Sequence, residues 1–192
     1  WTPRLLIFSM AATLVSLMVS ATQISPARRP SITIYMGVFP IPANSAAVLE
    51  KTAPVKTGSA FKADGDTLET PFYRVKFDEN GYIASLYDVQ ADREVRNLSG
   101  ASLGTLWFGE DVPNSWDNWD IVADIQPKFK DCAELLNEEV VSNGAAQLRI
   151  RRVYKLSELS TIRQDMIFHV HTPRIDFETE IDWHDKRRFL KT

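Results

Sequence analysis

The sequence is poor in the residues on which several common kinds of site depend. Cys132 is its single cysteine, which excludes an internal disulfide and a cysteine cluster for a metal. It has three histidines, and it contains no G-x-S-x-G nucleophile motif and no glycine-rich phosphate loop. The formal net charge of -3 supplies no basic excess for a polyanion, so we do not expect nucleic-acid binding. We interpret Cys132 as a small, buried hydrophobic residue.

What the chain does have is the composition of an ordinary globular protein, with 192 residues of which 44% are hydrophobic and 24% charged. This length suits one domain, or one domain with part of another. We place a boundary within residues 51–66, where Pro, Gly, Lys, Ser and Asp occur without periodicity. Residues 1–66 are then an N-terminal segment with the end of a preceding β domain, and residues 67–192 are a C-terminal domain.

Residues 5–21 resemble a secretory signal, because an apolar run after Arg4 leads to small residues at cleavage-site spacing. Ser and Thr interrupt the run, and it is too short to span a bilayer well, so we expect no membrane partner. Three interpretations stay open: a precursor with its signal, a piece of a longer protein, or a pair of apolar strands. We favour a piece of a longer protein, because neither end of the chain carries a terminal signal.

Apolar and polar residues alternate along most of the remaining chain, which is typical of strands with one face in water. Residues 73–77 and 83–87 are expected to form a hairpin that turns at Asn80-Gly81, because both residues tolerate positive φ. Ile175, Phe177, Ile181 and Trp183 are expected to point inward from one strand. The expected fold is all-β, an antiparallel β-sandwich, with further strands at residues 31–36, 46–49, 93–95, 138–141, 145–156, 161–170 and 174–183.

An aromatic and acidic loop is the main candidate site. Residues 105–108 are expected to form a short strand that ends at Gly109, and residues 113–115 have turn chemistry. The loop then carries Trp116, Asp117, Trp119 and Asp120. In one interpretation the indoles are buried in the core and their N–H groups donate hydrogen bonds to the carboxylates. In the other, the indoles stack on a sugar and the carboxylates accept hydrogen bonds from its hydroxyl groups.

Two histidines offer a weaker alternative. His169 and His171 share one face of an expected strand and would supply two ligands of a metal without a third. From the residues alone we therefore assign no metal site and no catalytic residue to this chain.

Three blocks of the sequence resemble a known family in their order and spacing. They are similar to the C-terminal β-domain of the zinc-dependent retaining α-mannosidases, glycoside hydrolase family 38, in their bacterial branch. The blocks are FYRVKFDENGYIASLYDVQADREV (72–95), LWFGEDVPNSWDNWDI (106–121) and FETEIDWHDKRRFLK (177–191).

The resemblance implies a supersandwich of the galactose-mutarotase-like type that packs on a catalytic α/β barrel of the same protein. The carboxylate nucleophile and the zinc would belong to that barrel, so this chain alone is expected to be inactive. Trp116, Asp117, Trp119 and Asp120 match the family motif and are our substrate-binding candidates for an α-mannoside. The resemblance favours a cytoplasmic protein, whereas a genuine signal would indicate secretion.

Two other functions stay open at this point. The same loop would serve a carbohydrate-binding module that works alone, and a sandwich domain can also be purely structural. The sequence leaves a homo-oligomer open as well.

Overall fold

The computed structural model divides the chain into two compact units, and each is described by itself. The first comprises Trp1–Gly58 with Gly144–Ala146, and the second Ser59–Asn143 with Gln147–Thr192. The backbone is described for residues 4–9, 13–23, 31–41, 45–50, 58–113 and 123–192, and the side chains for residues 58–113 and 125–192.

The first unit consists of two antiparallel strand pairs. β1 (Arg4–Ser9) pairs with β4 (Ser45–Glu50), and β2 (Thr13–Gln23) pairs with β3 (Ser31–Ile41). The strands expected at residues 31–36 and 46–49 are therefore present, and the signal-like run contributes β1 and much of β2. β3 continues through Pro40, which a two-stranded pair tolerates because each strand has an unpaired edge.

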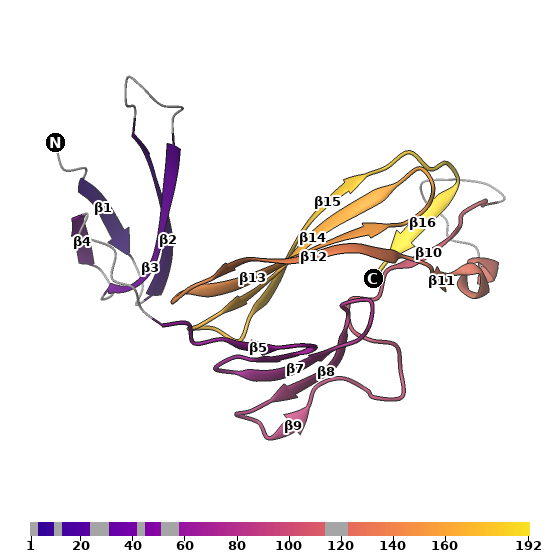
Figure 1. The fold of residues 1–192 in the computed structure, drawn as a ribbon, viewed down its shortest axis with the longest axis horizontal. Helices are drawn as coiled ribbons and strands as arrows, with labels where there is room; N and C mark the ends of the chain where they lie inside the picture. The colour runs from indigo at the N-terminus through magenta and orange to yellow at the C-terminus, as the bar shows by residue number, and fades with distance from the viewer. Residues whose placement is uncertain (1–3, 10–12, 24–30, 42–44, 51–57, 114–122) are drawn as a thin grey trace. The chain divides into compact units, whose positions relative to one another are not determined.

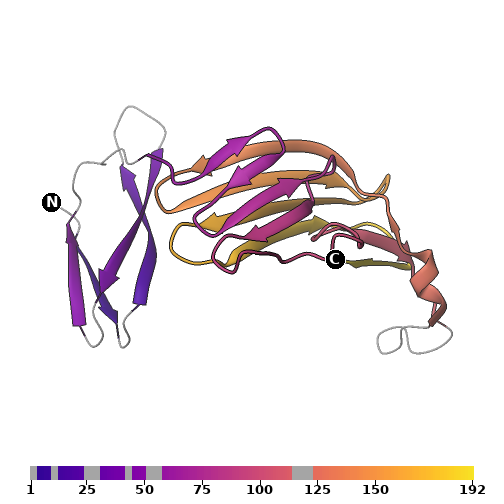
Figure 2. The ribbon, with the colours of Figure 1, turned by 90° about the horizontal axis from the view of Figure 1, so that it is seen from below.

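The second unit is an antiparallel β-sandwich (Figures 1 and 2). Its larger sheet has the order β12 (Glu134–Asn143), β13 (Gln147–Lys155), β14 (Thr161–His169) and β15 (Ile175–Asp182). The facing sheet has the order β5 (Lys62–Asp64), β6 (Thr67–Glu69), β7 (Tyr73–Phe77), β8 (Ile83–Asp88) and β9 (Arg93–Glu94). The predicted all-β sandwich is confirmed.

A third sheet lies at one end of the second unit. It has the order β11 (Lys130–Asp131), β10 (Trp107–Glu110) and β16 (Arg188–Lys191). A short 3-10 helix, η1 (Ala123–Lys128), precedes β11. The described residues include no helix that is long and apolar enough to cross a membrane.

Alternation along the central strands builds the core between the two large sheets. Leu148 and Ile150 on β13 are buried against Met166 and Phe168 on β14 and against apolar side chains of the facing sheet. A second cluster, around Tyr154, continues the core toward the third sheet. Burying one face of each sheet in this way gives the two-layer architecture its stability.

The predicted β7–β8 hairpin is confirmed, but its turn differs from the expected one. Only Gly81 of the Asn80-Gly81 pair has positive φ, at 77°, and residues 78–82 form the loop. The Asp78 carboxylate accepts hydrogen bonds from the backbone N–H groups of Asn80 and Tyr82, at 3.0 and 2.9 Å. This side-chain cap stabilises a wider loop, so Asn80 does not need the left-handed region.

Two strand boundaries differ from the sequence prediction because of tertiary pairing. β10 begins at Trp107 and runs through Gly109, where we expected it to end, because Gly109 pairs with Phe189 of β16. A Cβ at Gly109 would lie 3.0 Å from the Phe129 ring, so close packing requires glycine there. β12 begins at Glu134 rather than residue 138, because Glu134 pairs with Lys155 at the end of β13.

The inward residues of β15 are less covered than expected. Phe177 and Ile181 lie opposite the buried Met166 and Ile162 of β14, yet they are 43% and 45% exposed. Trp183 is 37% exposed. β15 is the last strand of its sheet, so the described residues cover this part of its inner face only partly. We call Phe177, Ile181 and Trp183 the β15 strip.

Candidate functional site

The predicted substrate-binding residues, Trp116, Asp117, Trp119 and Asp120, lie outside the described residues. Their assignment stays a prediction. The described structure does define what precedes and follows them in the chain. β10 leads into this stretch through Asp111, and η1 follows it. The residues around these two elements therefore form the candidate site that the structure can describe.

One face of the third sheet carries the side chains of this site. Phe108 of β10 pairs with Lys130 of β11, and Glu110 pairs with Arg188 of β16. Because residues opposite each other in an antiparallel pair share a face, these four side chains lie on the same side of the sheet. The Phe108 ring is buried, and Trp183 holds it edge-on at 5.6 Å between ring centroids.

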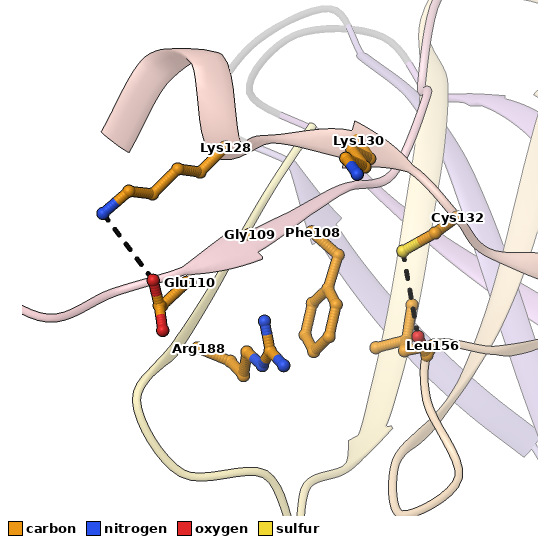
Figure 3. Close-up of a pocket in the computed structure, with 8 residues that line it drawn as sticks. All are labelled: Phe108, Gly109, Glu110, Lys128, Lys130, Cys132, Leu156 and Arg188. Carbon is orange, nitrogen blue, oxygen red and sulfur yellow. Dashed lines mark hydrogen bonds and ion pairs between the residues drawn. The ribbon is translucent and has the colours of Figure 1, made fainter. Parts of the chain in front are cut away.

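These side chains line a pocket of about 330 Å³ (Figure 3). Phe108 and Leu156 give it apolar walls, and four charged side chains, those of Glu110, Lys128, Lys130 and Arg188, also line it. The full lining is Phe108, Gly109, Glu110, Lys128, Lys130, Cys132, Leu156 and Arg188. We call it the β10 pocket.

Basic side chains outnumber acidic ones in the β10 pocket. Lys128 lies 3.7 Å from Glu110, as the dashed line in Figure 3 marks. The Arg188 guanidinium carbon lies 5.8 Å from the centroid of the Phe108 ring. Among the described residues, neither Lys130 nor Arg188 forms an ion pair within 4 Å. The pocket thus combines an aromatic wall with excess positive charge.

The interpretation of Cys132 as a buried residue is wrong. It is an exposed free cysteine in the wall of the β10 pocket, and its Sγ lies 4.0 Å from the Leu156 carbonyl oxygen. The pKa of the thiol is raised mainly by its partial burial, and the neighbouring Asp131 charge adds to this effect. The thiol is therefore protonated at neutral pH, which disfavours a nucleophilic role.

Asp111 is a polar residue of this site that was not predicted from the sequence. Its backbone N–H donates to the Arg187 carbonyl at 2.9 Å, which fixes the chain where β10 ends. Its Oδ1 atom is buried and has no hydrogen-bond partner in the part of the chain that the structure describes. Since an unpaired buried carboxylate oxygen is costly, Asp111 is suited to accept a hydrogen bond from a ligand or from another part of the protein. The feature of the sequence that could have identified Asp111 is its position just after an expected strand.

The histidines do not assemble into a metal site in the described structure. His169 Nε2 lies 2.8 Å from an Asp176 carboxylate oxygen, and Arg174 contacts the other oxygen. The hydrogen bond from Arg174 is the largest cause of the lowered pKa of Asp176, and the one with His169 contributes less. Among the described residues, no group of three or more His, Cys, Asp or Glu side chains could hold a metal ion.

A serine–aspartate cluster beside the third sheet is structural in its geometry. The Ser157 and Ser160 hydroxyls both donate to Asp185 Oδ2, at 2.5 and 2.6 Å, and these bonds lower its pKa. Ser160 is fully buried, and its hydroxyl also accepts from the backbone N–H of His184. No imidazole contacts either hydroxyl, so the cluster joins two turns and does not activate a nucleophile.

Comparison with known proteins gives a consistent result. A profile of the glycosyl hydrolases family 38 C-terminal domain matches residues 68–192. Alpha-mannosidase 2C1 of Homo sapiens is 29% identical over 132 residues, which are 68% of this chain and 13% of that protein. Alpha-mannosidase G of Dictyostelium discoideum is 28% identical over 135 residues, 67% of this chain and 12% of its own length. The chain thus spans about an eighth of these relatives.

The fold has a counterpart among solved structures. A crystal structure of a protein in glycosyl hydrolase family 38 from Enterococcus faecalis superposes with a TM-score of 0.57 and 14% identity. The superposition covers 99% of this chain and 27% of the other. At this identity the likeness concerns the fold alone.

Proposed function

This chain belongs to glycoside hydrolase family 38, as its C-terminal domain over residues 68–192, and we propose that it serves an α-mannosidase that hydrolyses terminal α-mannosides. The observation that carries the proposal is this match, because it extends over most of the second unit of the structure. The alpha-mannosidase names of its relatives supply the substrate class.

The proposed role of this domain is to pack on the catalytic part of the same protein. The β15 strip supports this role, because Phe177, Ile181 and Trp183 present apolar surface on the core-facing side of a sheet edge. Exposed apolar patches of this kind mark interaction sites. The third sheet lies beside the strip, since the Phe108 ring contacts Trp183. Docking there would bring the β10 pocket close to the catalytic part.

Trp116, Asp117, Trp119 and Asp120 are the residues that we propose contact the sugar. Each indole offers a face on which the C–H groups of a pyranose can stack, and each carboxylate can accept a hydroxyl proton. Asp111 supports this assignment, because its buried Oδ1 lacks a hydrogen-bond partner among the described residues and it lies five positions before Trp116 in the sequence. An acceptor at that position suits a surface that is completed by a ligand or by the catalytic part.

The reaction itself is proposed to take place on residues outside this chain. Family resemblance indicates a retaining mechanism with a carboxylate nucleophile and a zinc ion. The described residues offer no cluster that would hold zinc, so we propose that the catalytic part supplies both the nucleophile and the zinc ligands. The same resemblance supports a cytoplasmic location.

An activity assay on a longer gene product tests the proposal. The longest coding frame that contains this chain should hydrolyse an aryl α-mannoside when zinc is present. In that protein, Asp120→Asn should reduce turnover by more than tenfold while the melting temperature changes little, because the loss concerns a sugar contact. A conservative control is Asp64→Asn, at an exposed position on β5. Absence of turnover on α-mannosides, with activity on another glycoside, would contradict the proposal.

A further inference from the structure

We propose that the β10 pocket binds an oxyanion, a phosphate or carboxylate group, carried on a sugar. The sugar part of this inference rests on the proposed function, whereas the anion part rests on the pocket alone. The pocket is formed by one face of the third sheet, where β10, β11 and β16 place aromatic, acidic and basic side chains together (Figure 3).

The charges of the pocket are not balanced by its own residues. Three cations, Lys128, Lys130 and Arg188, line it together with a single carboxylate, Glu110. Glu110 lies within ion-pair distance of Lys128. Lys130 and Arg188 then remain without an ion-pair partner among the described residues. Two such cations in one concave site provide the charge that a phosphate or carboxylate needs.

Two acids near these cations, Asp131 and Asp185, have hydrogen-bond partners of their own. Asp131 follows Lys130 on β11 and therefore points to the other face of the strand, where it accepts from the Tyr82 hydroxyl at 3.4 Å. Asp185 accepts hydrogen bonds from the two serine hydroxyls described above, and the Arg188 charge also contributes to its lowered pKa. Burial and the Asp131 charge raise the pKa of the Cys132 thiol in the pocket wall, whereas the Arg188 and Lys130 charges lower it.

The aromatic wall favours an anion that is attached to a sugar over a free ion. The Phe108 ring is kept in place by Trp183, and it closes the pocket together with Leu156. A pyranose could place its C–H face against such a wall while its charged group meets Lys130 and Arg188. The volume of about 330 Å³ is at the lower end of the range for small-molecule sites and suits one sugar unit.

Nuclear magnetic resonance titration of the 15N-labelled 192-residue chain tests the inference. The probes are mannose 6-phosphate, mannuronate, mannose and inorganic phosphate, each at the same ionic strength. We expect the amide signals of residues 108–110, 130–132 and 188 to shift with mannose 6-phosphate or mannuronate, with a Kd at least tenfold lower than for mannose. The stronger of the two ligands identifies the anion as phosphate or carboxylate. Added salt should weaken this binding, since the charges are exposed.

Charge-neutralising variants provide the control. Lys130→Gln and Arg188→Gln should each raise the Kd about tenfold, as expected for loss of one charge-assisted hydrogen bond. Both positions are exposed, so the spectra should otherwise match the parent. Lys76→Gln removes the same charge on β7, in another sheet, and should leave the Kd unchanged.

The possible results separate this inference from the proposed function. Equal Kd values for mannose and its charged derivatives, or no shifts at the pocket, would overturn the anion site without affecting the α-mannosidase assay. Equal binding of inorganic phosphate and mannose 6-phosphate would overturn the sugar part. Loss of binding in Lys76→Gln to the same extent as in Lys130→Gln would also overturn the site, because the effect would then be one of net charge.

Discussion

The outer face of the larger sheet contains one carboxylate whose removal has a calculable effect on stability. Asp165 on β14 is only 4% exposed and lies between two arginines of β13. Arg151 contacts both of its carboxylate oxygens, and Arg149 contacts one of them, all at 2.8 Å. The pKa of Asp165 is lowered from 3.8 to about 2, and the hydrogen bonds from Arg151 are the largest cause. Burial opposes this lowering with a smaller effect.

This lowering of the pKa is a contribution to stability. At about 1.4 kcal/mol per pH unit, it corresponds to about 2–3 kcal/mol of the free energy of unfolding. Between pH 4 and pH 2 the unfolded state binds more protons than the folded state, so the contribution is complete above about pH 4. It is lost as the pH falls through about 2. Asp165→Asn should therefore cost about 2–3 kcal/mol at pH 7 and much less near pH 2.

Urea unfolding followed by tryptophan fluorescence at pH 7, 4, 3 and 2.5 measures this difference. Four of the five tryptophans, at positions 107, 116, 119 and 183, belong to the second unit, so the signal reports its unfolding. Glu180→Gln is the matched control, because Glu180 pairs with Arg163 on the same face but is 70% exposed. It should change stability little at any pH. A cost below about 0.5 kcal/mol for Asp165→Asn at pH 7 would refute the reasoning, since a buried carboxylate with two arginine partners should contribute more. A cost that does not shrink below pH 4 would refute it as well.

Three further predictions follow from the core, a turn and the proposed role. Phe168→Ala should reduce the free energy of unfolding by about 3–5 kcal/mol in the same urea assay, because the ring is 2% exposed between the two large sheets; a cost below about 1 kcal/mol would contradict this packing. Gly81→Ala should lower the melting temperature more than Gly65→Ala, because both have positive φ but only at Gly81 would a Cβ collide with the Arg152 side chain; equal effects would contradict the close approach. The 192-residue chain alone should not hydrolyse an aryl α-mannoside with added zinc, and turnover above the buffer rate would show that it contains catalytic groups.

The local pattern of the sequence was sufficient for the elements in which each residue alternates between water and core. β13 is an example, because buried and partly exposed residues alternate along it, with Leu148, Ile150 and Tyr154 on the buried face and Arg149 and Arg151 on the other. The β7–β8 hairpin was equally predictable, since glycine at position 81 supplies the positive φ that its turn requires. The motifs also identified the family, which the profile match to residues 68–192 confirms.

The prediction of the candidate site went less far. The sequence singled out Trp116, Asp117, Trp119 and Asp120, and these residues lie outside the described structure. It did not indicate the β10 pocket, because Phe108, Cys132 and Arg188 are far apart in the chain and no motif links them. Only the pairing of β10 with β11 and β16 brings them to one face.

The sequence by itself thus determined the all-β class, the hairpin and the family, because period-two burial and turn chemistry act between near neighbours. Tertiary structure decided the extent of β10, the exposure of Cys132 and the uncovered strip on β15. Each of these depends on which distant strand lies alongside. Gly109 stays in a strand because β16 pairs with it, and Phe177 is 43% exposed because its strand forms the edge of the sheet. Such pairings arise from contacts between residues dozens of positions apart, which local periodicity does not record.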